Sequence, residues 1–287
     1  MLYLKEFVLL TEDMEYNLIL NEKRRIYNNV YPCNIFTTKS FRNITFSPIT
    51  LFYGENGSGK TTLLHIIGKK IGAEARKSMN KGKYFDDYVA SCSCNIVNTE
   101  SLEEIKVVSS DDVFDYLLDV EAINSHINRK KEEICEEYLK YKYNSSSDFY
   151  NHYDELKNKV AANSQTMSKF TRDRIGNNNI ISHSNGETAL LYWERAIKEN
   201  GIYILDEPEN SLSASNILKL KKFIEDSMRF FNCQFIISTH SPFLLSIGGA
   251  TIYDLDSEPV SIRRWTELEN VKVYYQFFLN HKNEFDE

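Results

Sequence analysis

An eight-residue run in the first quarter of the chain has the residue types and spacing of a phosphate-binding loop. The pattern G-x-x-x-x-G-K-[ST] is met by Gly54, Glu55, Asn56, Gly57, Ser58, Gly59, Lys60 and Thr61. Glycines let consecutive backbone N–H groups turn inward around phosphate oxygens. The lysine reaches the β- and γ-phosphates, and the threonine hydroxyl binds Mg²⁺. The run therefore predicts a site for a nucleoside triphosphate and Mg²⁺, with Thr62 as a further contact.

The residues on either side of this run fit a strand–loop–helix unit. The apolar run 49–53 before it is typical of a buried strand, and residues 62–67 after it are typical of the first turns of a helix. The N-terminus of that helix would direct its positive dipole end at the phosphates. This context disfavours the alternative, a glycine-rich turn that arises by chance.

Two carboxylates end a second apolar run. Residues 202–205 are followed by Asp206 and Glu207, which is typical of a buried strand that delivers acids to a phosphate site. We expect Asp206 to orient the water shell of Mg²⁺ and Glu207 to polarise the attacking water as general base. The alternative is a strand that ends in a solvated acidic turn.

Two further elements have positions that suit a triphosphate. His240 follows the apolar run 235–238, and we expect it to sense the γ-phosphate from the neighbouring strand, although a lone histidine is more often structural. Ser184, Gly186 and Glu187 open a predicted helix over 188–198. A serine cap and a glycine at a helix N-terminus form a second anion site.

The elements that must position these residues alternate strand and helix. We expect an opening strand within residues 1–10, an antiparallel layer over 11–48, a strand at 105–108, and a helix from 109 to 118. Residues 202–238 read as a β–α–β crossover in a mostly parallel sheet. The charged segment 120–179 reads as a helical insertion, with helices over 121–143 and 153–162, between core segments 1–119 and 180–287.

Composition narrows the function classes. The chain of 287 residues carries a net charge of −7, so nucleic-acid contact would need a local basic patch. We interpret the basic run 69–83 as a solvated surface loop, and the alternative is that it contacts the phosphate backbone of a nucleic acid. Five cysteines without metal-ligand spacing fit reduced thiols in a cytoplasmic protein. Apolar runs stay short of the roughly 20 residues of a membrane span, so no membrane insertion is expected.

As a set and in this chain order, the motifs resemble those of the ATP-binding-cassette ATPases over residues 1–110 and 180–256. The segments 206–213, 238–245 and 249–256 are similar to small bacterial AAA-family ATPases of the soluble SMC and RecF branch. The resemblance implies an α/β fold of the P-loop NTPase, ABC-ATPase type, with a mixed or parallel sheet core, an N-terminal antiparallel layer and a helical insertion. It implies a head-to-tail homodimer in which each ATP lies between Lys60 of one subunit and Ser184 and Gly186 of the other.

Several positions depart from the transporter pattern. His183 and Glu187 replace the leucine and glutamine of the transporter signature, and Ser213 replaces an aspartate. A glutamine is missing after residues 107–108, where Asp111 or Asp112 is the nearest metal-capable substitute. Tyr31 and Phe36 are candidates for stacking on adenine, with a place in the core as the alternative.

We therefore expect an ATPase with Lys60, Glu207 and His240 as catalytic residues and Thr61, Asp206 and Asp111 at the metal. Its ATP-driven dimerisation would switch a contact with a partner protein, such as a nuclease or toxin, or with DNA or RNA, in DNA repair or antiviral defence. The basic run and Arg172 and Arg174 are the nucleic-acid candidates. Two alternatives stay open: a nucleotide-binding subunit of a membrane transporter, and a binding module clamped by ATP that it does not hydrolyse.

Overall fold

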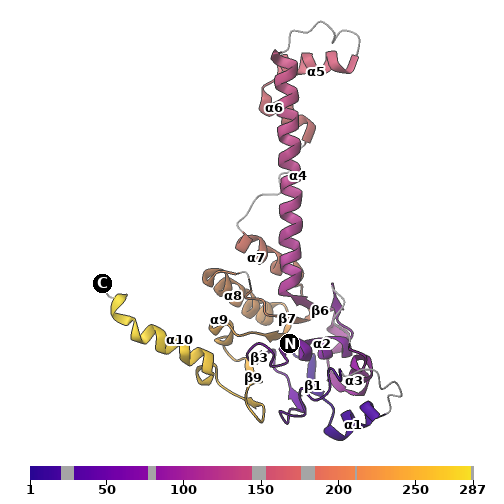
Figure 1. Ribbon diagram of the computed structural model, residues 1–287, viewed down its shortest axis with the longest axis vertical. Helices are drawn as coiled ribbons and strands as arrows, with labels where there is room; N and C mark the ends of the chain where they lie inside the picture. The colour runs from indigo at the N-terminus through magenta and orange to yellow at the C-terminus, as the bar shows by residue number, and fades with distance from the viewer. Residues whose placement is uncertain (21–28, 77–81, 144–152, 176–184, 211, 286–287) are drawn as a thin grey trace. The chain divides into compact units, whose positions relative to one another are not determined.

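The computed structural model describes residues 1–20, 29–76, 82–143, 153–175, 185–210 and 212–285 (Figure 1). The chain divides into two compact units. The larger one consists of Met1–Phe114 and Gly186–Glu287, and the smaller one of Asp115–Asn185. Ser184 and His183 lie outside the described residues.

A mixed sheet forms the centre of the larger unit. Its strands within the described residues have the order β10-β9-β3-β8-β7-β6-β4. All neighbours are parallel except β9 and β10. Their bounds are β3 Ile49–Tyr53, β4 Glu74–Ala75, β6 Glu104–Ser109, β7 Gly201–Asp206, β8 Gln234–Ser238, β9 Thr251–Asp254 and β10 Ser261–Ile262. Every residue of β3, β7 and β8 is buried, which explains their continuous apolar sequences.

A second, antiparallel sheet confirms the predicted N-terminal layer, but the segments that form it differ from those predicted. It has the order β2-β1-β5, with β1 Leu4–Val8, β2 Asn43–Thr45 and β5 Ser93–Ile96. Within the described residues, the predicted antiparallel layer over 11–48 is formed there only by β2, because Glu12–Leu20 is helix α1 and residues 31–40 form turns. Buried Glu15 holds these turns: its Oε2 accepts hydrogen bonds from the Asn34 backbone N–H and the Thr37 hydroxyl.

One buried side chain joins the two sheets. Gln234 at the start of β8 is fully buried, and its Oε1 accepts hydrogen bonds from the backbone N–H groups of Tyr3 (2.9 Å) and Leu4 (2.8 Å). Its Nε2 donates to the carbonyls of Leu4 (2.8 Å) and Ser47 (3.2 Å). All four hydrogen-bonding positions of the amide are therefore used between strands that are distant in sequence.

Helix α2, Lys60–Lys70, packs on the core sheet through Leu63, Leu64, Ile66 and Ile67, all fully buried. Gly68 permits this close contact, because a Cβ there would lie 2.8 Å from Cγ2 of Val107. The other helices of the larger unit are α3 Phe85–Ser91, α7 Asn185–Ala196, α8 Ala214–Phe230, α9 Pro242–Leu245 and α10 Glu269–Asn280, with short 3-10 turns at Thr99–Ser101, Trp265–Glu267 and Lys282–Glu284. The predicted crossover is confirmed, since α8 connects the adjacent parallel strands β7 and β8.

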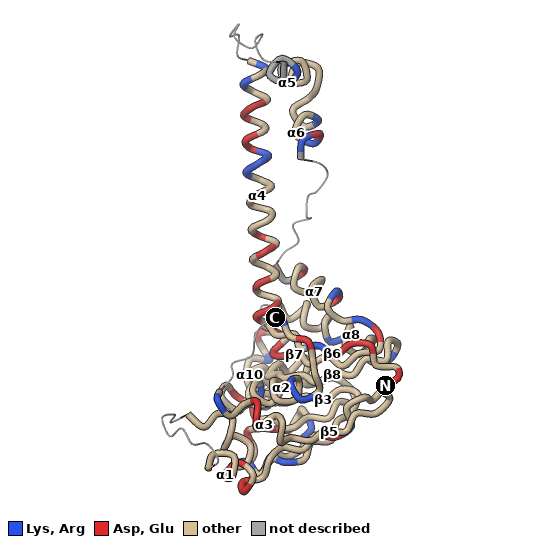
Figure 2. The backbone as a smooth tube through the Cα atoms, turned by 90° about the vertical axis from the view of Figure 1, so that its right-hand side faces the viewer, with Lys and Arg blue, Asp and Glu red and all other residues tan. Residues whose placement is uncertain are grey.

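The smaller unit is helical. Helix α4 runs without interruption over Ser110–Tyr143, so the predicted break near residue 119 is wrong. Acidic and basic residues succeed one another in short stretches along it (Figure 2), as is typical of a solvated helix. Helices α5, Tyr153–Ser164, and α6, Met167–Ile175, pack against α4 through the cluster of Tyr138, Ala162 and Phe170.

Within the described ranges, the helices are too short or too polar to span a bilayer.

Candidate nucleotide site

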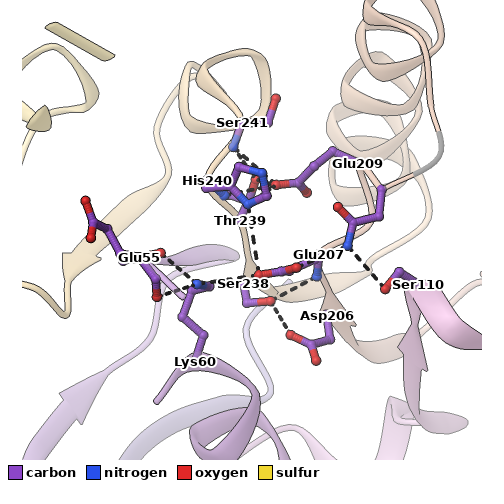
Figure 3. A network of polar contacts seen from close by, with 12 residues as sticks. Glu55, Lys60, Ser110, Asp206, Glu207, Glu209, Ser238, Thr239, His240 and Ser241 are labelled. Atoms are coloured by element: carbon purple, nitrogen blue, oxygen red, sulfur yellow. Dashed lines mark hydrogen bonds and ion pairs between the residues drawn. The ribbon is translucent and has the colours of Figure 1, made fainter. Parts of the chain in front are cut away.

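The predicted loop, acids and histidine lie at one edge of the core sheet. Strands β3, β8 and β7 are consecutive and parallel, so their carboxyl ends meet there. The phosphate-loop run follows β3, Asp206 ends β7, and His240 follows β8. In α/β sheets this edge is where ligands bind. Figure 3 shows the side chains converging from these three elements.

The loop has a backbone that only glycine adopts readily. Gly57 and Gly59 have φ angles of 89° and 100°, in the left-handed region. Gly54 is restricted for a different reason, since a Cβ there would lie 2.5 Å from Oγ of Ser58. Lys39 holds the loop from outside, with Nζ donating to the carbonyls of Ser58 (2.9 Å) and Leu255 (2.7 Å).

Lys60 is buried inside the loop. Its Nζ donates hydrogen bonds to the carbonyls of Gly54 (2.6 Å) and Glu55 (3.0 Å) and lies 3.5 Å from Oε1 of Glu207 (Figure 3). The side chain is 4% exposed. A buried ammonium needs such partners, and an incoming phosphate can replace the two carbonyls with a stronger, charged acceptor.

Ser238 ties the two acidic residues together. Its hydroxyl donates to Oδ1 of Asp206 and accepts from the backbone N–H of Glu207 (2.9 Å). Asp206 is therefore held as an acceptor at the buried end of β7, where it is 8% exposed. The serine could not be assigned from sequence, because its role depends on the register that pairs it with Asp206 across β7 and β8.

Glu207 lies at the centre of the charged groups. Its φ of 47° is in the left-handed region, which is costly for a residue with a Cβ and is concentrated at functional sites. Its Oε1 lies 3.5 Å from Lys60 Nζ and 4.0 Å from His240 Nδ1. Its Oε2 accepts from Nδ2 of Asn210 at 3.1 Å. The carboxylate is thus fixed by a lysine and an amide and is partly open to solvent, with 23% of the side chain exposed.

His240 sits beside a second glutamate that the sequence did not single out. Its Nδ1 lies 3.4 Å from Oε1 of Glu209, which is 6% exposed. Burial raises the pKa of the Glu209 carboxyl, while hydrogen bonds from Thr239 and the backbone and the charge of His240 oppose the rise. His65 on α2 also lies near the acids: burial lowers its pKa, and the charge of Asp206 opposes that.

A cavity of about 400 Å³ opens beside the loop. It is lined by Tyr53, Gly54, Glu55, Asn56, His240, Glu269, Asn270 and Val273. The loop, the histidine and the start of α10 therefore face one space large enough for a phosphate chain or for a segment of another molecule.

For the remaining predicted residues, the structure gives the position but does not test the role. Thr61 and Thr62 lie in the first turn of α2, and Thr62 accepts a hydrogen bond from the Tyr31 hydroxyl (3.2 Å). Asp111 is exposed in the first turn of α4, while its neighbour Asp112 is buried and accepts hydrogen bonds from the Ser109 N–H and hydroxyl. Gly186 and Glu187 lie in the first turn of α7. Their roles at a nucleotide stay predictions.

Of the two aromatic candidates for adenine, Phe36 is fully buried in the core and packs close to Gly59, which rules it out as a stacking surface. Tyr31 is partly exposed, and its ring lies parallel to that of Phe85 at a centroid distance of 6.2 Å. Tyr31 stays a prediction.

A model of the family described as AAA domain matches residues 33–240. The chain belongs to the AAA domain family. Membership implies nucleotide binding, and the match covers the phosphate loop, the acidic strand end and His240. No curated protein matches the sequence.

Solved structures similar to this AAA domain protein share little sequence with it. A metal-chelate type ABC transporter in an inward-facing conformation has 17% identity and a TM-score of 0.38, covering 82% of each chain. The dimeric ATP-binding cassette MJ0796 bound to ADP and Pi has 16% identity and a TM-score of 0.34, covering 79% of this chain and 90% of that one. The SmcHead bound to the C-winged helix domain of ScpA has 14% identity and a TM-score of 0.36, covering 77% and 92%.

The donor set of this AAA domain protein fits Mg²⁺ bound together with a nucleotide. No group of three or more His, Cys, Asp or Glu in the described ranges could hold a metal alone. Mg²⁺ in nucleotide sites keeps several waters and takes one or two protein oxygens plus phosphate oxygens. The Asp206 carboxylate and the Thr61 hydroxyl are oxygen donors of this kind.

Proposed function

We propose that the protein is a Mg²⁺-dependent ATP hydrolase whose ATP-driven dimerisation switches a partner protein. The observation that carries the proposal is the position of Glu207. Its Oε1 lies 3.5 Å from the phosphate-loop lysine and 4.0 Å from His240, at the sheet edge where the loop begins. A carboxylate placed between a phosphate-binding lysine and a histidine is suited to act on a water beside the terminal phosphate.

In the proposed reaction, Lys60 exchanges its two carbonyl acceptors for oxygens of the β- and γ-phosphates. A water held by Glu207 attacks the γ-phosphorus, the bond from that phosphorus to the β–γ bridging oxygen breaks, and the water proton passes to the Glu207 carboxylate. His240 positions the γ-phosphate. The chain would hold Mg²⁺ through Thr61 and Asp206, where it neutralises phosphate charge.

Dimerisation would complete this site. We propose that Ser184, Gly186 and Glu187 of the partner subunit meet the phosphates in a head-to-tail homodimer. The support is local: Gly186 and Glu187 lie at the beginning of α7, where helix N–H groups without intrahelical partners suit an anion. A second metal-capable group, Asp111, would approach from the first turn of α4.

A protein partner is favoured over nucleic acid. Of the basic candidates, Lys70 donates to the Ala90 carbonyl. The guanidinium of Arg174 donates to Asn158 and lies 3.5 Å from the centre of the Phe170 ring, so its charge is engaged in contacts within the smaller unit. We propose a cytoplasmic role beside an effector such as a nuclease or toxin, in DNA repair or antiviral defence. Contact with DNA or RNA, a transporter subunit and a clamp without turnover are the alternatives.

The test is steady-state ATP hydrolysis by wild type and three variants. Lys60→Ala should abolish ATP binding and turnover. Glu207→Gln should bind ATP and lower kcat about a hundredfold or more, as expected for loss of a general base. Glu136→Gln makes the same chemical change at an exposed position on α4 and serves as the control. Turnover in Glu207→Gln equal to that of wild type would contradict the role of Glu207.

A further inference from the structure

Helix α10 exposes a large apolar surface. Every residue from Lys272 to Asn280 is exposed, and most of them are apolar or aromatic. Tyr275, Phe277 and Phe278 have exposed fractions of 68%, 55% and 53%. Aromatic side chains bury about 150–250 Å² each, so these three rings alone leave roughly 350 Å² uncovered. Apolar patches above a few hundred Å² mark interaction sites on soluble proteins, so α10 has the exposure of such a site.

One face of α10 lines a groove of about 620 Å³. Val271, Tyr274, Tyr275 and Phe278 line it from α10, at the i, i+3, i+4, i+7 spacing of a single helix face. Further apolar lining comes from α8, α9 and the turn before α10: Ile217, Pro242, Phe243 and Trp265. A hydrophobic groove of this kind receives the apolar face of an amphipathic helix.

Two polar atoms of the groove lining have no partner. Oε2 of Glu209 and Oγ of Ser241 are buried and make no hydrogen bond in the described chain. The other oxygen of Glu209, Oε1, accepts from the Thr239 hydroxyl at 2.6 Å and from the N–H groups of His240 (2.9 Å) and Ser241 (3.2 Å) (Figure 3). An unpaired buried oxygen is costly, so a donor brought by a ligand would stabilise the groove.

The charges of the lining favour a basic donor. Glu209 is its acidic residue, and His240 is the one described lining residue that can carry a positive charge. A guanidinium would bring a full charge and several N–H donors to the carboxylate, and it also packs well on aromatic rings. The lining face of α10 has no basic residue, so the same face of a second copy would bring no positive charge to Glu209.

We propose that the groove between α9 and α10 binds an amphipathic helix of a partner protein, with an arginine on its apolar face that pairs with Glu209. The apolar side chains of that helix would cover Tyr274, Tyr275 and Phe278. The rings of Trp265 and Tyr275 would flank the arginine. The site would thus be that of the partner which the proposed function invokes.

The groove is also connected to the nucleotide site. His240 lines both the groove and the cavity beside the phosphate loop. Asn270 of α10 donates to the His240 carbonyl at 3.0 Å. A nucleotide that moves His240 would therefore change the affinity of the groove for the helix. This link to ATP rests on the proposed function, whereas binding in the groove can be measured without nucleotide.

The test is selection and titration of helical peptides on the full chain without nucleotide. The probe is a phage-displayed library of peptides about 16 residues long, enough to form a helix, with one face varied among apolar residues, arginine and glutamine. We expect the selected peptides to carry arginine on that face. A synthetic copy with glutamine in its place should bind about tenfold more weakly to wild type, and the two peptides should bind alike to Glu209→Gln.

The matched pair of variants lies on α10. Phe278→Ala should weaken peptide binding about tenfold or more, as expected for an aromatic residue at the centre of an interface. Phe277→Ala is the control, because Phe277 has a similar exposure on the same helix and does not line the groove. It should bind the peptides as wild type does.

Four results would overturn the proposal. They are a library that yields no binder, peptides that bind Phe278→Ala as tightly as wild type, and peptides with no preference for arginine. The fourth is a dimer of the nucleotide-free wild type that Phe278→Ala abolishes, which would assign the groove to a second copy.

The link to ATP has its own measurement. Peptide affinity for Glu207→Gln should differ about fivefold or more between the nucleotide-free and the Mg²⁺-ATP-bound protein, and equal affinities would contradict the link. If wild type hydrolyses no ATP, the proposed function fails, and the titrations without nucleotide still decide whether the groove binds a basic helix.

Discussion

Replacement of Gln234 by leucine gives the sharpest test of how the two sheets are joined. The leucine has a similar volume but no hydrogen-bonding atoms, so it leaves two buried N–H groups, those of Tyr3 and Leu4, without their acceptor. It also removes the donor to the carbonyls of Leu4 and Ser47. The Ser47 carbonyl keeps a contact with the Thr50 hydroxyl at 3.4 Å, so its loss is the smaller one.

The magnitude follows from the two N–H groups. An orphaned buried donor costs about 1–3 kcal/mol, so the variant should lose about 2–6 kcal/mol of unfolding free energy. For a protein of this size each kcal/mol shifts the melting temperature by about 2–4 °C, which predicts a fall of roughly 10 °C. The contribution is large because the Gln234 side chain is fully buried, and so are three of the four hydrogen bonds that its amide makes.

Thermal and urea unfolding, followed by circular dichroism, measure this loss. Gln276→Leu is the matched control, because Gln276 is exposed and its amide bonds only Asn280 among the contacts described. We expect the control to unfold within about 0.5 kcal/mol of wild type. A Gln234→Leu protein as stable as the control would refute the view that this amide joins the sheets.

Three further predictions follow from burial and packing. Because burial raises the pKa of Glu209, the folded wild type binds a proton more tightly than the unfolded chain and loses stability as pH rises above about 4.3. The melting temperature of Glu209→Gln minus that of wild type should therefore increase from pH 4 to pH 7, and a constant difference would contradict the shift. Gly54→Ala places a Cβ 2.5 Å from Ser58 Oγ and should weaken ATP binding about tenfold or more, whereas Gly248→Ala, with no atom within 4 Å, should bind normally in the same titration. Burial raises the pKa of the Cys33 and Cys233 thiols to about 11 and that of the Cys92 thiol to about 12. Mass spectrometry after treatment of the folded protein with iodoacetamide at pH 8 should therefore find these three thiols unmodified, and rapid labelling of any of them would contradict their burial.

The fold around the nucleotide site could be predicted because its sequence signals are local. Short apolar runs predicted β3, β7 and β8 nearly to the residue, and parallel pairing then places their carboxyl ends together. Lys60, Asp206, Glu207 and His240 meet at that edge for this reason.

The features that the sequence did not predict depend on contacts between distant residues. Helix α1 has mixed polarity, and buried Glu15 anchors the turns of residues 34–37, which no periodicity reveals. Helix α4 continues past residue 119 where a change in composition suggested a break. Ser238 and Glu209 have roles only through the register of β7 against β8 and the turn after β8, so their types alone gave no signal.

The most direct test of the central claim is the oligomeric mass of Glu207→Gln in solution, measured by light scattering with Mg²⁺ and either ATP or ADP. We predict a dimer of twice the 33.5 kDa chain with ATP and a monomer with ADP, since binding without cleavage would trap the sandwich. Lys60→Ala should be monomeric with either nucleotide. A Glu207→Gln protein that binds ATP and stays monomeric would contradict ATP-driven dimerisation as the switch.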